Sequence, residues 1–509
     1  MKPVIKNIFM SFKVLLISPP VFDFYYTPAR KEPLGLLYIA EALSNIEGLE
    51  VKLLDALEPY KSKKVQWPEH FNYLKKYYCE DTSPFSLFQK YQRFGMSFQA
   101  ITKKTSEFNP DLICITSNFS AYHNDVLRLV QAIRETTSIP IAIGGWAIFA
   151  MDMTQHKRNE NIYYIKGDGE IEIPNLVATL MNNSQNNKSN EEYYSKENFF
   201  FNHYPKIRGS YSFRGMKSAR VIFSKGCSFR CSFCSIHKRH SFNQRSISEI
   251  TQELDYLHSQ GIELVDIEDD NLFHNKAWAS ELLLVLNNFN KKGMKFSAMN
   301  GITSSNLVPF IDEAIESGFI EFNLSLVTTH STINTSINRN PSLKDITLIA
   351  IKSMNKVPVL CFLIAGLPDS SPHALLNDIL MLSALPLIIG YSPLYLLPGV
   401  EYLEKLKLPE NSDFMRGSAL HRFGNKFTIE DITSLWKLVR MINHIKECED
   451  FGKIDQETMY YFKKSIEEKN WYHKKKDDTW HKGFVFNMNF PDSIKIINMK
   501  GKEFILELK

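Results

Sequence analysis

Residues 219–234 read ARVIFSKGCSFRCSFC, an apolar run followed by a glycine and three closely spaced cysteines. Arg220–Phe223 has the β-branched and aromatic character of a buried strand. After the cysteines, Ser246 and Glu249 have the spacing of a capping box, and apolar residues recur at the helical period at positions 247, 250, 254 and 257. A strand, a loop and a helix in this order predict a βα unit with the cysteines beyond the carboxyl end of its strand.

The same alternation continues to residue 400. Further strand-like runs, separated by helical patterns, lie at Leu264–Ile267, Lys295–Ala298, Phe319–Ser325, Val357–Ile364 and Ile389–Leu397. Six strand-helix units of this kind can curl into an open parallel barrel, in which ligands gather beyond the carboxyl ends of the strands. Residues 216–400 are therefore predicted to form a partial (βα)6 barrel.

A second alternating region precedes the barrel. Its expected strands are Val14–Ile17, Val51–Leu54, Leu112–Thr116, Ile139–Ile143 and Ile162–Ile165, and helical patterns include Leu34–Ile46 and Tyr122–Glu135. An insertion at about 60–96, rich in Tyr, Phe, Lys and Gln, follows the second strand. Short strands alternating with helices predict βαβ units, so residues 13–182 are expected to form a doubly wound, Rossmann-like parallel sheet.

The remaining segments carry weaker patterns. Residues 183–199, NSQNNKSNEEYYSKENF, are polar and aperiodic, which favours a linker over 183–215. Residues 401–509 are expected to form a small α+β region, with a helix near Ile429–Glu447 and short strands around Phe484–Leu508. The run HKKK at 473–476 is interpreted as a solvated face.

The composition excludes several classes of protein. The chain has 509 residues, of which 44% are hydrophobic and 23% charged, and this excludes collagen-like, fully disordered and disulfide-scaffold proteins. A net charge of +4 is too small to indicate nucleic acid or an anionic membrane. The long charge-free run Ile379–Val400 contains three prolines and two glycines, a poor match to a spanning helix. Val14–Ile17 is interpreted as a buried strand and not as part of a signal peptide. A soluble, cytoplasmic protein without a nucleic-acid or membrane partner is expected.

The chemistry is concentrated in the cysteine loop. Cys227, Cys231 and Cys234 could supply three thiolates to a cubane cluster and leave its fourth iron without a protein ligand. A zinc site completed by His237 or His240 is one alternative, and a ligand-free structural loop is another. The other four cysteines are expected to be buried in apolar strands or isolated: Cys114, Cys361, Cys79 and Cys448.

The pattern Cys-x3-Cys-x2-Cys, with Phe233 before the third cysteine, resembles the signature of the radical S-adenosylmethionine (SAM) superfamily. The N-terminal part resembles the branch of that superfamily that contains a cobalamin-binding domain. The supporting segments, in chain order, are Pro33-Leu-Gly-Leu, Asn109-Pro-Asp-Leu-Ile, Gly144-Gly145, Gly167-Asp-Gly-Glu170, Glu268-Asp-Asp-Asn271, Asn300-Gly-Ile302, Asn323-Leu-Ser-Leu326, Gly366-Leu-Pro368 and Pro398-Gly399.

The resemblance implies how SAM would be held. The three cysteines would bind a 4Fe-4S cluster whose open iron chelates SAM, and one-electron reduction would cleave the sulfonium to a 5′-deoxyadenosyl radical. The acidic edge after the second barrel strand would contact the ammonium group of SAM. The fourth strand would contact its ribose, and a glycine turn would contact its adenine. The residues implied in SAM binding are Phe233, Glu268, Asp269, Asn323, Ser325 and Gly366.

The resemblance also implies a cobalamin site at the strand ends of the first domain. The implied contacts are Thr116, Ser117, Asn118, Gly144, Gly145, Gly167, Gly169 and Glu170. No Asp-x-His-x-x-Gly motif occurs, so a histidine lower ligand of that type is not expected.

The leading hypothesis is a radical SAM enzyme that, with cobalamin, methylates an unactivated carbon or phosphorus of a small molecule. One alternative is a radical SAM cyclase or rearrangement enzyme with cobalamin as redox partner or absent. Another is a non-catalytic corrinoid or metal-binding sensor. An electron donor such as flavodoxin or ferredoxin is the implied partner.

Overall fold

A computed structural model of the chain describes residues 11–26, 32–44, 46–151, 161–185, 203–206, 211–339, 341–404, 406, 408–420 and 426–508. The chain divides into two compact units. The first comprises Met1–Val65, Gln92–Tyr211 and Asn411–Asp413, and the second comprises Gln66–Tyr91, Ser212–Glu410 and Phe414–Lys509. The domain bounds stay a prediction, and much of the expected linker (186–202 and 207–210) lies outside the described residues.

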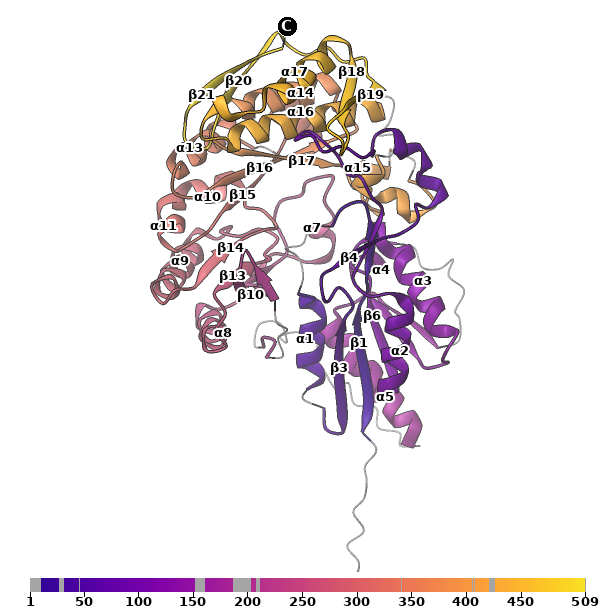
Figure 1. The fold of residues 1–509 in the computed structure, drawn as a ribbon. Helices are drawn as coiled ribbons and strands as arrows, with labels where there is room; N and C mark the ends of the chain where they lie inside the picture. Colours follow the sequence, from indigo (N-terminus) through magenta and orange to yellow (C-terminus); the bar gives the residue numbers. More distant parts are fainter. Residues whose placement is uncertain are drawn as a thin grey trace, which may run out of the picture. The chain divides into compact units, whose positions relative to one another are not determined.

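The first unit is built on a five-stranded parallel sheet (Figure 1). The strand order is β3-β1-β6-β7-β8, with bounds Leu49–Asp55, Phe12–Ser18, Leu112–Thr116, Ile141–Gly144 and Ile162–Ile165. This confirms the doubly wound prediction. The chain order reverses between β1 and β6, and ligands of such sheets bind outside the carboxyl ends of the strands at this switch point.

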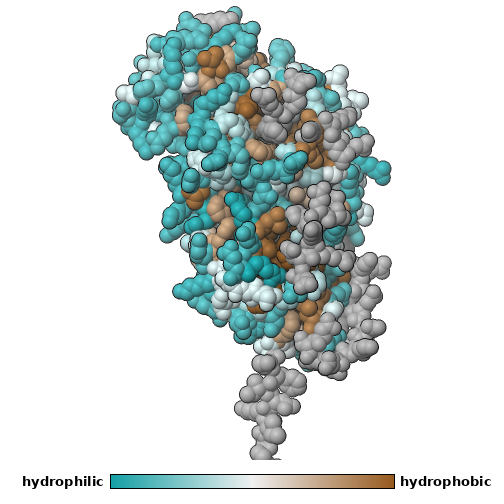
Figure 2. Space-filling view, turned by 90° about the vertical axis from the view of Figure 1, so that its right-hand side faces the viewer, coloured by the Kyte–Doolittle hydropathy of each residue, from teal (hydrophilic) through white to brown (hydrophobic). Residues whose placement is uncertain are grey.

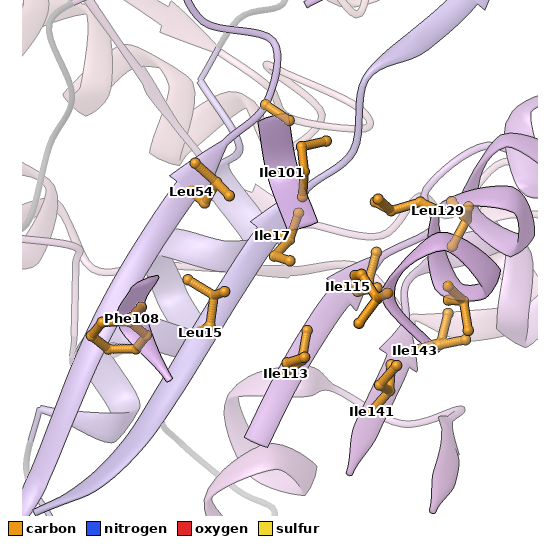
Figure 3. Packing of buried hydrophobic residues seen from close by; sticks show 14 of the residues in the cluster. Leu15, Ile17, Leu54, Ile101, Phe108, Ile113, Ile115, Leu129, Ile141 and Ile143 are labelled. Atoms are coloured by element: carbon orange, nitrogen blue, oxygen red, sulfur yellow. The ribbon is translucent and has the colours of Figure 1, made fainter. Parts of the chain in front are cut away.

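Alternating residues of each strand enter opposite layers of the core, so both faces of the sheet are covered. Leu15 and Ile17 face one layer, where Ile101 and Phe108 of α2 (Phe98–Phe108) and Leu129 of α3 (His123–Arg134) pack (Figure 3). The other layer brings together residues of β1, α1 (Leu34–Leu43) and α5 (Gly169–Gln185): Val14, Leu16, Leu36, Ala40, Ile173 and Val177.

The second unit contains six parallel barrel strands in chain order, as the sequence predicts. Three lie in one sheet, β10 (Met216–Val221), β13 (Leu264–Ile267) and β14 (Lys295–Ser297). The other three are β15 (Phe322–Val327), β16 (Val359–Ala365) and β17 (Ile388–Pro393). Parallel bridges Phe296↔Phe319 and Ile302↔Leu324 join the third strand region to the fourth, which gives the partial barrel.

Helices between these strands have the expected start signals. Helix α8 (Ile247–Ser259) begins at a complete capping box, in which Ser246 Oγ accepts from Glu249 N and Glu249 Oε2 accepts from Ser246 N. Such a cap stabilises a helix by about 1 kcal/mol. The apolar residues at positions 250, 254 and 257 are buried beneath it, so the helical period identifies its inner face.

Residues 66–91 of the insertion belong to the second unit, a placement that chain order alone does not indicate. They contain a 3-10 helix (Glu69–Lys76) and contact α16 (Ile429–Glu447), in which Lys437 Nζ lies 3.2 Å from Asp81 Oδ2. The flanking insertion residues form β4 (Ser62–Lys64) and β5 (Gln92–Phe94), which pair with β2 (Val21–Asp23) in the first unit.

The C-terminal region is α+β, as expected. It contains α16, α17 (Gln456–Glu467) and two antiparallel strand pairs, β18 (Asn470–Lys474) with β19 (Trp480–Val485) and β20 (Ser493–Ile497) with β21 (Glu503–Glu507). The interpretation of 473–476 as a solvated face is wrong for its first half. His473 and Lys474 are half-buried because they pair with β19, whereas residues 475 and 476 are exposed.

On the face drawn in Figure 2, hydrophobic residues are interspersed among hydrophilic ones. Among the described residues, no helix has the length and apolar character needed to cross a membrane.

Candidate functional site

The cysteine loop is closed at its base by a short strand pair that sequence reasoning missed. β11 (Ser224–Lys225) pairs antiparallel with β12 (Asn243–Gln244), directly after β10. Gly226 begins the loop with φ +81°, and a Cβ there would collide with the carbonyl oxygen of Ser241. Only glycine permits this close approach of two backbone segments, so the start of the loop is fixed before the first cysteine.

A second segment, at the carboxyl end of β15, clamps the middle of the loop. Ser232 N donates to Ile337 O at 3.0 Å, and Asn338 Nδ2 donates to Arg230 O at 2.9 Å. Arg339 reaches further in, with Nη1 3.8 Å from Cys231 Sγ and Nη2 donating to Ser325 O. These contacts order a loop that has little regular structure of its own.

The three predicted cysteines lie close enough to influence one another's ionisation. Burial, together with the neighbouring charges of Cys231 and Cys227, raises the pKa of the Cys234 thiol to about 11. Burial also raises the pKa of Cys227, whereas the Phe229 amide and Arg339 lower it. Among the described residues, no group of three or more His, Cys, Asp or Glu side chains is arranged to hold a single metal ion.

The acidic residues after β13 are each engaged within the unit. Asp269 is buried and accepts from Phe223 N at 2.7 Å and from Ser224 Oγ, so it fixes the path from β10 to β11. Its burial raises its pKa to about 7. Glu268 pairs with Arg220, and Asp270 accepts from Gly226 N at 2.8 Å at the base of the cysteine loop.

The other residues implied in SAM binding lie on or beside the central strands. Asn323 is buried in β15, where its Nδ2 donates to Glu321 Oε1 at 3.0 Å. Ser325, two residues on, offers its carbonyl oxygen to Arg339. Gly366 follows β16 with φ +90°, and Phe233 is half-buried in the loop.

In the first unit, the predicted contacts after β6 and β7 meet at one edge of the sheet. Ser117 N donates to Gly144 O at 2.7 Å, and Thr116 Oγ1 donates to Asn118 Oδ1 at 3.0 Å. Gly145 has φ +109°, and a Cβ there would lie 2.7 Å from Asn118 Oδ1 and 2.8 Å from Ser117 O. The glycine therefore lets the two loops approach each other beside the switch point.

The predicted contacts after β8 have visible packing roles. A Cβ at Gly169, the first residue of α5, would lie 2.7 Å from Ile39 Cδ1, so this glycine permits close packing of α5 on α1. A Cβ at Gly167 would lie 2.6 Å from Glu172 Oε1. Gly167 is exposed and Glu170 is half-buried in the first turn of α5. A ligand-binding role for the three residues stays a prediction.

The cysteine loop, the acidic edge and the barrel strands β13, β14, β15 and β16 lie within the span of one family model. Residues 221–382 match the model described as the radical SAM superfamily. This segment of the chain is a radical SAM domain.

Curated relatives of this chain include two methyltransferases. Cytidylyl-2-hydroxyethylphosphonate methyltransferase from Streptomyces wedmorensis is 24% identical over 346 residues, which cover 57% of this chain and 60% of the relative. An uncharacterised methyltransferase from Pyrococcus horikoshii is 23% identical over 296 residues, which cover 53% of this chain and 56% of the relative. The chain thus spans less than two thirds of the length of either. The anaerobic magnesium-protoporphyrin IX monomethyl ester cyclase of Synechocystis is 25% identical over 199 residues, covering 35% and 40%.

Two solved structures share the fold of this chain. The radical SAM methyltransferase TsrM from Kitasatospora setae, with cobalamin and a 4Fe-4S cluster bound, superposes with a TM-score of 0.56 at 15% identity and 78% coverage of both chains. The cobalamin-dependent SAM radical enzyme OxsB, with aqua-cobalamin and SAM bound, gives a TM-score of 0.51 at 13% identity, covering 80% of this chain and 55% of that one.

Sequence reasoning missed the residues that order the cysteine loop of the radical SAM domain. Arg339 lies 108 positions from Cys231, and no local pattern links the two. His274, whose Nε2 lies 2.9 Å from Ser228 Oγ and whose ring meets Phe242, follows an acidic motif that was interpreted only for SAM. Asp270 could have been singled out from the sequence, because it belongs to the same acidic motif. Its hydrogen bond from Gly226 N, however, depends on the tertiary structure.

Proposed function

We propose that this chain reductively cleaves SAM at a 4Fe-4S cluster and, with cobalamin, transfers a methyl group to an unactivated carbon or phosphorus of a small molecule. The observation that carries the proposal is the ordered loop with Cys227, Cys231 and Cys234 beyond β10 of a radical SAM domain. The names of the two methyltransferase relatives and the fold shared with TsrM and OxsB support the methyl-transfer part.

The residues of the loop fit a cluster. Three thiols are the donor set that a cubane with one open iron requires, and each must lose its proton on ligation. A bound cluster of this type supplies the electron that cleaves SAM. The chain itself fixes the loop through Gly226 and Asp270, and Arg339 Nη1 lies 3.8 Å from Cys231 Sγ.

The contacts to SAM are assigned by the same proposal. Glu268 and Asp269 would meet the ammonium group, Asn323 and Ser325 would meet the ribose, Gly366 would meet the adenine, and Phe233 would lie at the cluster edge. Glu268 pairs with Arg220, and Asp269 accepts two hydrogen bonds within the unit, so both carboxylates are held in place for this contact.

Cobalamin is proposed to bind at the carboxyl edge of the first sheet. Thr116, Ser117, Asn118, Gly144 and Gly145 surround that edge beside the switch point, where a flat, large ligand can approach the backbone. Bound cobalamin supplies a cobalt that carries the methyl group.

One substitution distinguishes loss of the proposed cobalamin site from general destabilisation of the sheet. Gly145→Ala should weaken cobalamin binding by at least about tenfold, because an alanine at φ +109° is strained and its Cβ displaces the Ser117–Asn118 loop. Isothermal titration with hydroxocobalamin measures the change. Gly48→Ala is the matched control. Gly48 also has positive φ, +78°, but it lies at the opposite edge of the same sheet and a Cβ there meets nothing within 4 Å. Equal losses in both variants would contradict the assignment.

Methyl transfer is tested by the products of the reduced enzyme with SAM. Release of both 5′-deoxyadenosine and S-adenosylhomocysteine is expected, since only methyl transfer from SAM yields the second product. Release of 5′-deoxyadenosine alone would favour a cyclase or rearrangement enzyme, the second candidate, to which the Synechocystis cyclase relative points. Neither product would contradict both and leave a non-catalytic sensor.

The electron for this reaction is proposed to come from a small redox protein such as flavodoxin or ferredoxin. Replacing dithionite with either protein in its reduced form should sustain turnover. A requirement for dithionite would contradict this part.

A further inference from the structure

We infer that Arg339 is a positioning residue that raises the reduction potential of the cluster by donating a hydrogen bond to the thiolate of Cys231. The inference rests on the proposed function, because it requires that Cys231 ligate iron. It adds a residue to which neither the sequence pattern nor the comparisons give a role.

The geometry places a fixed positive charge against one cluster ligand. Arg339 Nη1 lies 3.8 Å from Cys231 Sγ, within the range of an N–H···S hydrogen bond. Cys231 is 6% exposed, so water screens this contact poorly.

Arg339 is held through both its side chain and its backbone. Its Nη2 donates to Ser325 O in β15, and the backbone N of Arg339 donates to Asn334 O at 2.9 Å. The neighbouring Asn338, at φ +52°, binds Arg230 O in the cysteine loop. The side chain is therefore oriented before any cluster binds, and no rearrangement is needed for the contact.

The third nitrogen of the guanidinium, Nε, also supports a contact between Arg339 and the cluster. Arg339 Nε is buried and has no hydrogen-bond partner among the described residues. A buried donor of a charged group without a partner is costly, so an anion beside the guanidinium would stabilise it. A cluster held by three thiolates is an anion at this position.

The electrostatic consequence follows from the change of charge on reduction. Reduction adds one negative charge to the cluster, and an adjacent guanidinium stabilises the reduced form more than the oxidised form. Hydrogen bonds to ligand sulfurs and net charge are two of the factors that set cluster potentials. Arg339 therefore makes the cluster easier to reduce.

The test uses the full chain, reconstituted anaerobically, and Arg339→Gln. We expect the ratio of reduced to oxidised cluster at a fixed applied potential to fall about tenfold, a shift of about 59 mV for one electron. Potentiometric titration followed by electron paramagnetic resonance measures it. Arg339→Lys keeps the positive charge but loses the planar set of N–H donors of the guanidinium. It should give a ratio of reduced to oxidised cluster between those of wild type and Arg339→Gln.

Arg230→Gln is the matched control. Arg230 lies in the same loop and is exposed, and its backbone oxygen, not its side chain, takes part in the contact with Asn338. This variant should retain the wild-type ratio. A stronger reductant, such as titanium(III) citrate, should restore SAM cleavage to Arg339→Gln, which it could not do if the substitution only disordered the loop.

Two results would overturn the inference. One is Arg339→Gln with a full cluster and the wild-type ratio. If Arg339→Gln retains no cluster, Arg339→Lys is measured in its place. A wild-type ratio of reduced to oxidised cluster in Arg339→Lys would then be the second result that overturns the inference. A wild-type chain that assembles no 4Fe-4S cluster would overturn the proposed function together with the inference, whereas a normal wild-type cluster with unchanged variants overturns the inference alone.

Discussion

Replacing Cys231 with alanine abolishes formation of 5′-deoxyadenosine from SAM. The variant removes one of three thiolates, so the cluster has only two protein ligands and is lost or converted to a smaller form. The loss should exceed the roughly 10–100-fold that changes beyond the ligands cost in metal affinity or activity. Iron analysis and quantification of 5′-deoxyadenosine under dithionite measure it.

Cys448→Ser is the control for loss of a cysteine as such. Cys448 is half-buried at the end of α16, where its Sγ lies 3.2 Å from His444 O, and a serine hydroxyl preserves that donor. It should retain full iron and full activity. Equal activity of Cys231→Ala and wild type would show that the loop holds no catalytic cluster.

The second large effect concerns the stability of the C-terminal region. Lys437 and Asp81 form an ion pair with side chains 4% and 2% exposed, and Asp81 Oδ1 also accepts from Ser83 N and Lys474 N. Lys437→Met leaves a buried carboxylate without its cation, so we expect the free energy of unfolding to fall by about 3–5 kcal/mol. Thermal and urea unfolding, followed by tryptophan fluorescence, measure the change.

Lys476→Met provides the comparison. Lys476 Nζ lies 3.5 Å from Glu80 Oε1, one residue before Asp81, but the two side chains are 69% and 59% exposed. Exposed pairs contribute about 0–1 kcal/mol, so this variant should unfold close to wild type. The combined variant Asp81→Leu with Lys437→Met should recover part of the loss, because it removes both buried charges. A Lys437→Met protein as stable as Lys476→Met would contradict the burial of the pair.

The sequence predicts well whatever depends on local periodicity. The strands Leu112–Thr116, Ile162–Ile165 and Leu264–Ile267 are found with the predicted bounds, because each is a short apolar run between clear turn signals. The capping box at Ser246 likewise places the start of α8.

Contacts between distant segments are what the sequence does not reveal. Residues 66–91 lie in chain order within the first alternating region, yet they contribute Asp81 and several tyrosines to the second unit. The pairing of β11 with β12 and the contact of Arg339 with Cys231 also join residues far apart in the chain. No local residue pattern encodes such partners.

In the site too, local sequence patterns predict some features, whereas contacts between distant residues cannot be predicted from them. The three cysteines were found by their spacing, whereas the acidic motif was interpreted as uniform although its members differ. Asp269 and Asp270 accept hydrogen bonds from residues 223–226, and Glu268 pairs with Arg220. Which carboxylate remains available to a ligand depends on the turn after β13, and the motif alone does not show it.

The proposed cofactors can be counted directly from the iron, cobalt and zinc content of the chain, purified anaerobically from cells supplied with cobalamin. We expect about four irons and one cobalt per chain, with no stoichiometric zinc. One zinc per chain in place of iron would contradict the radical SAM mechanism.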